Sequence, residues 1–429
     1  MTERRSLNQS NDTTISRAAR SGNGRQILLL LALAAVAVLV GIFSLGLMGE
    51  DIDPVKEPID PAVEQEAEPD PPVALSFVAV GDVMVHRSQI SSQYDPQTGT
   101  YDYTDNFRYI KPYIQDADLA LANVETTFAG GTPTGYPSFN APDALANALA
   151  DTGFNVGLIS NNHLYDKGLA GMDRTIGILR VAGMKTAGAH LPGEKNYTLV
   201  EVKGVNVGIV SYTYETPSTD GLTRINGVVL PEAVAERINS FSHERLEEDL
   251  KNIEKTIEAA RSDGADIIIC YFHWGEEYQR SPNLWQRRIA EQAADMGADI
   301  VFASHPHVLQ SADRVKGPTT GKEIPVFFSM GNFLSNQRLE TLNNRYTEQG
   351  MIARVDLKFD KETGEISEMN MSAIGTWLDK YKAGGKDWYA IIPLDDALEN
   401  NETLRTSGHL TRAKQAYEDI RETLGTVLR

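Results

Sequence analysis

The chain has 429 residues, of which 41% are apolar, so it is long enough for one large domain or two ordinary ones with a sizeable core. Its 59 acidic and 40 basic residues give a formal net charge of −19. Because a phosphate backbone requires a basic protein surface, this charge argues against nucleic acid as a partner. The single cysteine, Cys270, excludes a disulfide within the chain and is predicted to be a buried strand thiol.

The first long apolar stretch, residues 27–48, contains no charged side chain and is long enough as a helix to cross a hydrocarbon core of about 30 Å. Residues 1–26 carry five arginines against two acidic residues, and the remainder of the chain is acidic. The positive-inside rule therefore predicts a cytoplasmic tail, a single transmembrane signal anchor and a main domain outside the cell membrane. An acidic, proline-rich linker is expected at residues 49–72. A cleaved signal peptide is the alternative to the anchor.

From residue 73 onward, apolar runs of strand length alternate with helical patterns. Strands are expected at residues 75–80, 118–123, 154–160, 205–212, 265–272, 299–303, 325–329 and 352–359. Helices are expected at residues 142–152, 169–182, 244–262, 284–296 and 413–428. This alternation predicts a layered α/β or αββα domain over residues 73–394, followed by a helical tail at residues 395–429.

Polar motifs follow the predicted strands, and ligand sites in open α/β sheets form outside the carboxyl ends of strands. Asp, Glu, Asn and His are hard-to-borderline metal ligands. Gly81 is expected to allow a sharp turn that presents the next carboxylate, although a helix cap is the alternative for such an aspartate. The motif residues predicted to build one site are Asp82, Asn123, Glu125, Asn162, His163, His273, His305 and His307.

His305 and His307 form the sharpest local signal. Alternate residues of an extended segment point the same way, and Pro306 holds its predecessor extended, so the two imidazoles are expected to converge. Asp166, three residues after His163, is expected to fix the tautomer of that histidine. The order of carboxylates, amides and imidazoles favours a two-metal hydrolytic centre, in which cations activate a water and clamp an oxyanion.

Side chains beside these motifs are predicted to contact a substrate. Trp274 follows the metal-ligand candidate His273 and is expected to shield the site and pack on substrate. For Asn332, the amide after the Gly331 turn, structural support is the alternative role. For Arg87 the alternative is a structural salt bridge. The residues assigned to substrate binding are Arg87, Asn123, Trp274, Glu277 and Asn332.

The ordered motifs resemble the CapA family of poly-γ-glutamate capsule biosynthesis proteins, whose domain is similar to calcineurin-type metallophosphatases. The resemblance extends from about residue 73 to residue 333. The residues that carry it are Gly81-Asp82-Val83-Met84 with Arg87, Asn123-Val124-Glu125-Thr126, residues 161–168, residues 273–278, residues 297–310 and Ser329-Met330-Gly331-Asn332-Phe333.

The resemblance implies a four-layer αββα sandwich around a site for two divalent ions, Mn, Fe or Zn, with His163 as the acid. It implies a membrane-anchored role in making, exporting or anchoring poly-γ-glutamate. An anionic polymer or a phosphorylated intermediate is then the substrate, and other synthesis subunits are partners. The ligand roles that it implies fall on Asp82, Glu125, Asn162, His273, His305 and His307.

Two positions depart from the metallophosphatase pattern. Met84 stands where a histidine is usual, with His86 as a candidate replacement, and Ser304 stands where a glycine is usual. A one-metal site, or a site that binds without turnover, therefore stays open. The competing functions are a metal-dependent hydrolase or phosphoesterase, a non-catalytic subunit that binds polymer or partner proteins, and a γ-glutamyl amide hydrolase.

Overall fold

The computed structural model describes residues 70–429. The predicted cytoplasmic tail, transmembrane segment and all but the last residues of the linker lie outside this range. Within it, no helix combines the length and apolar character needed to cross a bilayer.

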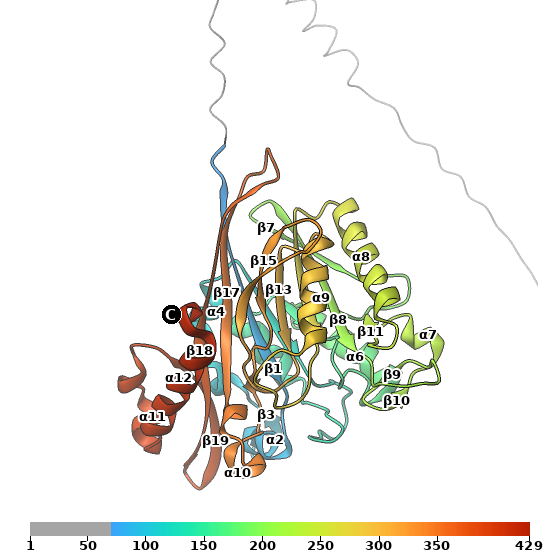
Figure 1. Cartoon of the computed structure of the whole chain (residues 1–429). Coiled ribbons are helices and arrows are strands. Elements are labelled where there is room, and N and C mark those ends of the chain that lie inside the picture. Colours follow the sequence, from blue (N-terminus) through green and yellow to red (C-terminus); the bar gives the residue numbers. More distant parts are fainter. Residues whose placement is uncertain (1–69) are drawn as a thin grey trace, which may run out of the picture. The chain divides into compact units, whose positions relative to one another are not determined.

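Two large mixed β-sheets form the centre of the domain (Figure 1). The eight-stranded first sheet contains β1 (Val73–Val83), β4 (Leu119–Val124), β5 (Val156–Leu158), β6 (Lys185–Ala187), β16 (Asn332–Leu334), β17 (Gln349–Phe359), β18 (Ile366–Ala383) and β19 (Lys386–Leu394). Its order is β19-β18-β17-β1-β4-β5-β6, with β16 paired to β1. The parallel pairing of β1, β4 and β5 brings their carboxyl ends to one edge.

The second sheet has seven strands in the order β11-β8-β12-β13-β15-β14, with β7 paired to β8. Its strands are β7 (Thr198–Val202), β8 (Val205–Tyr214), β11 (Ser240–Phe241), β12 (Ile267–His273), β13 (Ile300–Ser304), β14 (Ala312–Lys316) and β15 (Glu323–Phe327). Strands β8, β12, β13 and β15 are parallel neighbours, so their carboxyl ends also meet at one edge.

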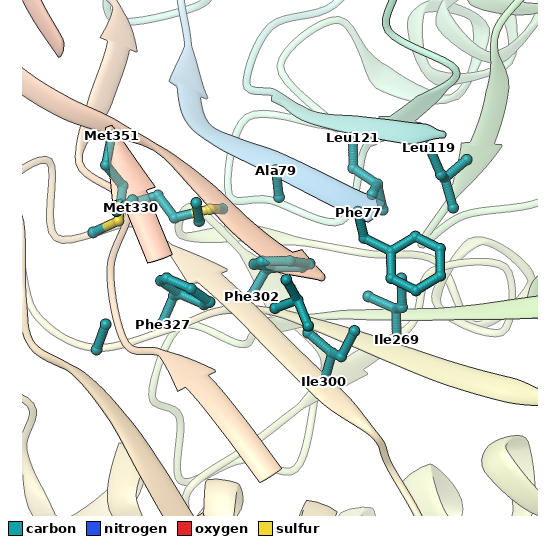
Figure 2. Packing of buried hydrophobic residues seen from close by; sticks show 14 of the residues in the cluster. Phe77, Ala79, Leu119, Leu121, Ile269, Ile300, Phe302, Phe327, Met330 and Met351 are labelled. Atoms are coloured by element: carbon teal, nitrogen blue, oxygen red, sulfur yellow. The ribbon is translucent and has the colours of Figure 1, made fainter. Parts of the chain in front are cut away.

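The inner faces of the two sheets pack against each other. Phe77 and Leu121 of the first sheet belong to the same buried cluster as Ile269 and Phe302 of the second, and Figure 2 shows these side chains meeting between the strands. Because successive strand residues point to opposite faces, Val78 of β1 instead packs in a second cluster on the outer face.

Helices cover the outer face of each sheet. The first sheet packs against α5 (Ala144–Thr152) and α6 (Gly168–Val181), whose apolar residues share its outer cluster. The second packs against α8 (Leu246–Ser262) and α9 (Leu284–Asp295). The chain is therefore a mixed α/β sandwich. Shorter helices are α2 (Arg87–Gln93), α3 (Thr104–Phe107), α4 (Lys111–Gln115), α7 (Glu232–Ala235) and α10 (Leu339–Leu342).

The predicted strands and helices match observed elements. No element is predicted between residues 360 and 394, where residues 366–394 form the long hairpin of β18 and β19. The C-terminal residues form α11 (Glu402–Ser407) and α12 (Leu410–Leu424), and both helices pack against β18. Cys270 lies buried in β12, as predicted, and burial raises the pKa of its thiol to about 12.

Candidate metal centre

The carboxyl ends of both sheets contribute to one buried cluster. Asp82 lies near the end of β1 and pairs in register with Asn123 of β4, which places Glu125 just beyond the neighbouring strand. His273 ends β12, and His305 follows directly after β13. These side chains are all polar or ionisable, and all are buried. Such residues are rarely buried for packing alone, so their burial indicates another role.

Gly81 lets two backbone segments approach each other closely. It does not form the sharp turn that the sequence predicts. Strand β1 continues to Val83 with a register shift around Asp82. A Cβ atom at position 81 would lie 1.9 Å from the Gly331 carbonyl oxygen, which accepts a 2.9 Å hydrogen bond from the Asp82 amide. Only glycine lets β1 and the segment before β16 approach this closely.

Asn123 connects the two carboxylates. Its Nδ2 donates to Asp82 Oδ1 at 2.8 Å and to Glu125 Oε2 at 3.2 Å, and its Oδ1 accepts from Asn161 Nδ2 at 3.2 Å. The side chain is fully buried. This arrangement favours an orienting role for Asn123 over the predicted substrate contact.

Two groups of candidate ligands share Glu125. Its carboxylate, with His305 and His307, forms one group, and with Asp82 and His273 it forms the other. Within each group the ligand atoms lie within 4.8 Å of one another. A carboxylate common to two such groups would serve as a ligand in both if each group held a cation.

Two buried atoms of this cluster lack hydrogen-bond partners among the described residues: Glu125 Oε1 and His305 Nδ1. An unsatisfied buried polar atom in a native fold calls for an explanation, and an ion is one of the few available. Glu125 Oε1 also lies 3.7 Å from His273 Nε2 and 4.0 Å from His307 Nε2. The donor set of carboxylates and imidazoles therefore fits divalent metal ions.

The electrostatics of the cluster match this chemistry. Burial, reinforced by the neighbouring Asp82, raises the pKa of Glu125 well above its ordinary value. Burial, with nearby imidazoles, lowers the pKa of His273 and His305 well below 6.5. Neutral imidazole is the form that ligates a metal. A cation would also favour the ionised form of the carboxylate, which burial alone disfavours.

Asn162, the predicted ligand that belongs to neither group, lies in the same cluster. Asn162 Oδ1 is 2.8 Å from His273 Nε2, and Asp82 Oδ2 is 2.9 Å from His307 Nδ1. Those contacts occupy atoms that a metal would also use, so we expect them to rearrange when ions bind.

His305 and His307 reach the cluster by a different backbone path from the predicted one. Their φ angles are +106° and +56°, so neither residue is extended, and their ring centroids lie 5.8 Å apart. The prediction of an extended segment held by Pro306 is wrong, although the two imidazoles do converge. Positive φ at two non-glycine residues is backbone strain of the kind that collects at functional sites.

His163 and Asp166 form the predicted pair. Asp166 Oδ2 lies 2.8 Å from His163 Nδ1 and accepts a 2.6 Å hydrogen bond from the Phe139 amide. The edge of the Phe139 ring packs on the imidazole at a centroid distance of 4.7 Å. The carboxylate and the ring together fix the orientation of His163 and leave its Nε2 for a ligand.

A cavity of about 330 Å³ adjoins the cluster. Glu277, one of the predicted substrate-binding residues, is exposed and lines it. Met84 and His86 also lie in the wall. His86 Nδ1 accepts a 3.1 Å hydrogen bond from the Asn336 amide, and neither ligand group among the described residues includes it. His86 therefore does not replace the histidine that is missing at position 84.

Three other predicted substrate contacts lie elsewhere. Trp274 is fully buried in the outer core of the second sheet and donates to the Phe328 carbonyl at 2.9 Å, so it packs the core and cannot reach a substrate. Asn332 is buried and donates to the Thr347 carbonyl at 2.9 Å, which is the structural role given as its alternative. Arg87 is exposed at the start of α2 and does not line the cavity.

Sequence reasoning missed the tyrosines that surround the histidines. Tyr271 Oη lies 3.2 Å from His273 Nδ1, and the Tyr214 ring lies 4.6 Å from the His305 ring. Tyr271 precedes His273 by two residues in one strand, so the period-two rule could have placed both on one face. Tyr214 lies on a different strand, and no local pattern indicates it.

The chain matches the family described as bacterial capsule synthesis protein PGA_cap over residues 76–337. It belongs to this family. A capsule biosynthesis protein CapA of Bacillus anthracis is 31% identical over 275 residues, which cover 61% of this chain and 60% of that protein. A PGA biosynthesis protein CapA of Bacillus subtilis (strain 168) is 27% identical over 276 residues, covering 61% and 64%. The matched region thus spans less than two thirds of each relative's length.

Two solved structures show weaker likeness. A novel phosphatase from Mycoplasma pneumoniae gives a TM-score of 0.39 at 13% identity, covering 71% of this chain and 94% of that one. The Thermus thermophilus sulfate thiohydrolase SoxB, in complex with glycerol, gives 0.32 at 16% identity, covering 59% and 38%. Likeness at this level carries no argument about fold or chemistry.

All candidate ligands of this capsule synthesis family member lie inside the matched residues 76–337. Strands β17 to β19 and helices α11 and α12 lie beyond them. The candidate metal centre is therefore carried by the matched region, and strands β17 to β19 with the two C-terminal helices lie outside it.

Proposed function

We propose that this chain is a membrane-anchored protein of the bacterial cell surface that takes part in poly-γ-glutamate biosynthesis or export. Residues 27–48 are the anchor, the main domain is extracellular, and other subunits of the synthesis machinery are its partners. The names of the two Bacillus relatives support a role in capsule and PGA biosynthesis. The charge asymmetry around the apolar segment supports the topology.

We further propose that the buried cluster is a dinuclear metal centre of a hydrolase, in a four-layer αββα sandwich of the metallophosphatase type. The observation that carries this proposal is the sharing of Glu125 between two ligand groups, with its Oε1 buried and without a hydrogen-bond partner among residues 70–429. When bound, two ions of Mn, Fe or Zn would supply Lewis acidity to a substrate oxygen. The residues that would hold them are Asp82, Glu125, Asn162, His273, His305 and His307.

The residues around the ions have separate tasks. Asn123 holds both carboxylates in place through Nδ2. His163 donates a proton from Nε2 to the leaving group, and Asp166 keeps the other ring nitrogen protonated and the ring oriented. The substrate is an anionic polymer or its phosphorylated intermediate, so the bond cleaved is a phosphoester or a γ-glutamyl amide.

A non-catalytic subunit that binds polymer or partner proteins is the second candidate. Met84 favours it, because this thioether side chain lies in the cavity wall where metallophosphatases usually place a histidine. Loss of one ligand can weaken the first ion and leave a site that binds without turnover.

The test measures metal content and turnover of the purified full-length protein. The His305→Ala/His307→Ala variant removes two ligands, Glu125→Gln removes the shared charge with little change of shape, and His190→Ala is the control. Within residues 70–429, the His190 side chain makes one hydrogen bond, with the adjacent Leu191 carbonyl, so its loss should not affect the centre. Two equivalents of metal in the wild type and control, lost in both site variants, are expected.

A substrate panel separates the chemistries. Turnover of a phosphodiester identifies a phosphoesterase, and release of glutamate from oligo-γ-glutamate identifies an amide hydrolase. Metal binding without turnover of either class would leave the binding subunit. Absence of metal from wild-type protein supplied with Mn, Fe or Zn would refute the metal centre altogether.

A further inference from the structure

The cavity at the metal centre contains no side chain suited to a polyanion. Among the described residues that line it, none is Lys or Arg, and Glu277 contributes a negative charge. With a formal net charge of −19 the whole chain repels anions at long range. Metal ions could attract one oxyanion at the reacting group, but further charges of a polymer would have to be balanced outside this cavity.

A second cavity, of about 490 Å³, adjoins the first. Asn336 and Thr341 line both, so the two cavities share a wall. Figure 1 shows α2, α10 and the lower part of β19 at the same end of the domain, which is the end toward which β1 runs. A chain that leaves the metal centre across this wall enters the second cavity.

The second cavity has the opposite charge character. Four basic side chains line it, against two acidic ones, Glu340 and Asp387. The basic residues are Arg338, Lys380, Lys382 and Arg412.

The two arginines are occupied by acidic partners. Arg412 donates to Glu340 at 2.7 Å and to Glu348 at 2.8 Å, and Arg338 lies 3.4 Å from each of the same carboxylates. These groups neutralise one another, so the arginines shape the wall and contribute little net attraction for an anion.

The two lysines are more available. Lys380 pairs with Asp387 at 3.2 Å and remains part-exposed, whereas Lys382 is exposed and forms no ion pair with any residue in the described part of the chain. They are alternate residues of β18, so both point to one face of the strand. An ammonium group is a compact, strongly hydrated point charge that accepts carboxylates without a fixed geometry.

We propose that this second cavity, built around Lys380 and Lys382, binds carboxylates of an extended anionic chain whose reacting group lies at the metal centre. The inference rests on the proposed function and specifies its substrate class: a polymer with repeated carboxylates, in preference to a small phosphorylated intermediate. The cavity is formed mainly by residues beyond the family match, since β18, β19 and α12 follow residue 337. In this proposal the metal centre supplies chemistry, and the C-terminal hairpin, which lies beyond the matched residues, supplies recognition.

The test uses the full-length, metal-loaded protein and two probes: fluorescently labelled oligo-γ-glutamate for affinity, and bis(p-nitrophenyl) phosphate as a small substrate that cannot reach the second cavity. The variants are Lys382→Glu and the double variant Lys380→Gln/Lys382→Gln. Lys251→Glu is the matched control, because Lys251 is exposed on α8, on the outer face of the other sheet.

Both cavity variants are expected to bind oligo-γ-glutamate about fivefold to tenfold more weakly at low salt, with the difference shrinking as salt screens the charges. Their kinetics on the small substrate should equal those of the wild type. The control should bind the oligomer within about twofold of the wild type. Lys382 is exposed, but it lies opposite Asp387 of β19, so Lys382→Glu adds cross-strand repulsion. The double glutamine variant adds no carboxylate and therefore separates a loss of binding from a loss of folding.

The outcomes separate the inference from the proposed function. Lysine-dependent binding of the oligomer without turnover of any substrate would uphold the inference and refute the hydrolase. Turnover with oligomer affinity that is unchanged in both variants would uphold the hydrolase and overturn the inference. Lysine-dependent binding of a polyphosphate probe, with no binding of oligo-γ-glutamate, would also overturn it, because the chain recognised would then carry phosphates.

Discussion

Replacing Glu125 with glutamine tests the metal centre through folding stability, independently of any substrate. Glu125 is fully buried, its Oε1 has no hydrogen-bond partner in the described part of the chain, and its Oε2 accepts from Asn123 Nδ2 at 3.2 Å. That amide makes its shorter contact, 2.8 Å, with Asp82. Without a metal, the carboxylate is therefore poorly solvated by the protein and repelled by a neighbouring charge. Glutamine keeps the shape and removes the charge.

The Glu125→Gln substitution is expected to change the free energy of unfolding in opposite directions with and without metal. An unsatisfied buried polar group costs roughly 1–3 kcal/mol, so the metal-free Glu125→Gln variant should be as stable as the wild type or up to about 2 kcal/mol more stable. Metal present at about a thousand times its dissociation constant should stabilise the wild type by roughly 4 kcal/mol. The variant should lose most of that gain. For a domain of this size 1 kcal/mol corresponds to roughly 2–4 °C in Tm.

The pH dependence gives a second readout of the same residue. The folded-state pKa of Glu125 is raised above its ordinary value of 4.5, so the folded metal-free protein holds a proton that the unfolded chain releases. Its stability should therefore fall as pH rises from about 4.5 toward the folded-state pKa. Glutamine does not titrate, and the variant should lack this decline.

Thermal unfolding followed by circular dichroism, with chelator and with Mn²⁺ or Zn²⁺, measures all three quantities. Glu254→Gln is the control, because Glu254 is exposed on α8 and the same substitution there should change neither Tm nor the metal-induced shift. A Glu125→Gln variant that keeps the full metal-induced rise in Tm would refute the bridging role. A metal-free variant several degrees less stable than the wild type would refute the electrostatic argument.

Further predictions concern three residues around the centre. The pKa of His86 is lowered to about 4 by burial and by the nearby His307, so the unfolded chain takes up a proton first and stability should be lost as pH falls from about 6.5 toward 4. His86→Asn, which keeps a polar acceptor for the Asn336 amide but does not titrate, should reduce that acid-induced loss by roughly 1–3 kcal/mol in denaturant titrations. Trp274→Ala should cost about 3–5 kcal/mol in the free energy of unfolding, whereas a substrate-contacting tryptophan would affect KM and leave stability unchanged. Asp166→Asn should lower kcat by roughly a hundredfold at unchanged metal content, and metal loss would instead assign Asp166 to the ligand set.

The sequence predicted the strands around the site because each reads as an apolar run that stops at a polar motif. Asp82 and Glu125 could be brought together from the sequence, since parallel strands of one sheet deliver their carboxyl ends to one edge. His273 ends a strand of the second sheet, so its place beside them also depends on the two sheets packing with these edges together. The hairpin of β18 and β19 could not be predicted in the same way. Much of β18 is only partly buried and carries polar residues at many positions, so neither a continuous apolar run nor a clean alternation marks it.

Two predictions about residues in or beside the site were wrong. One assumed the wrong backbone conformation, and the other placed a side chain on the wrong face of the sheet. The extended path assumed for His305 follows the general preference of residues before proline, and the observed φ of +106° departs from that preference. Trp274 follows a metal-ligand candidate in sequence, yet the period-two rule directs it to the opposite face of the sheet from His273, into the core beneath α9. Trp274 was expected near the site because it is adjacent to His273 in sequence. The alternation of side chains along a strand instead predicts that the two residues lie on opposite faces.

The way the β18–β19 hairpin is attached to the first sheet allows residues of the second cavity to change without moving the candidate metal ligands. Strand β1, which carries Asp82, pairs with β17 through Val80 and Ile352, and Ile352 pairs in turn with Ile374 of β18. Continuous backbone hydrogen bonds thus fix the hairpin to the strand that carries a candidate metal ligand. Lys382 lies beyond these pairs, near the turn into β19, where a side chain can change without altering the strand register. Changes near that turn should alter the charge offered to a polymer while leaving the position of Asp82, and hence metal binding, unaffected.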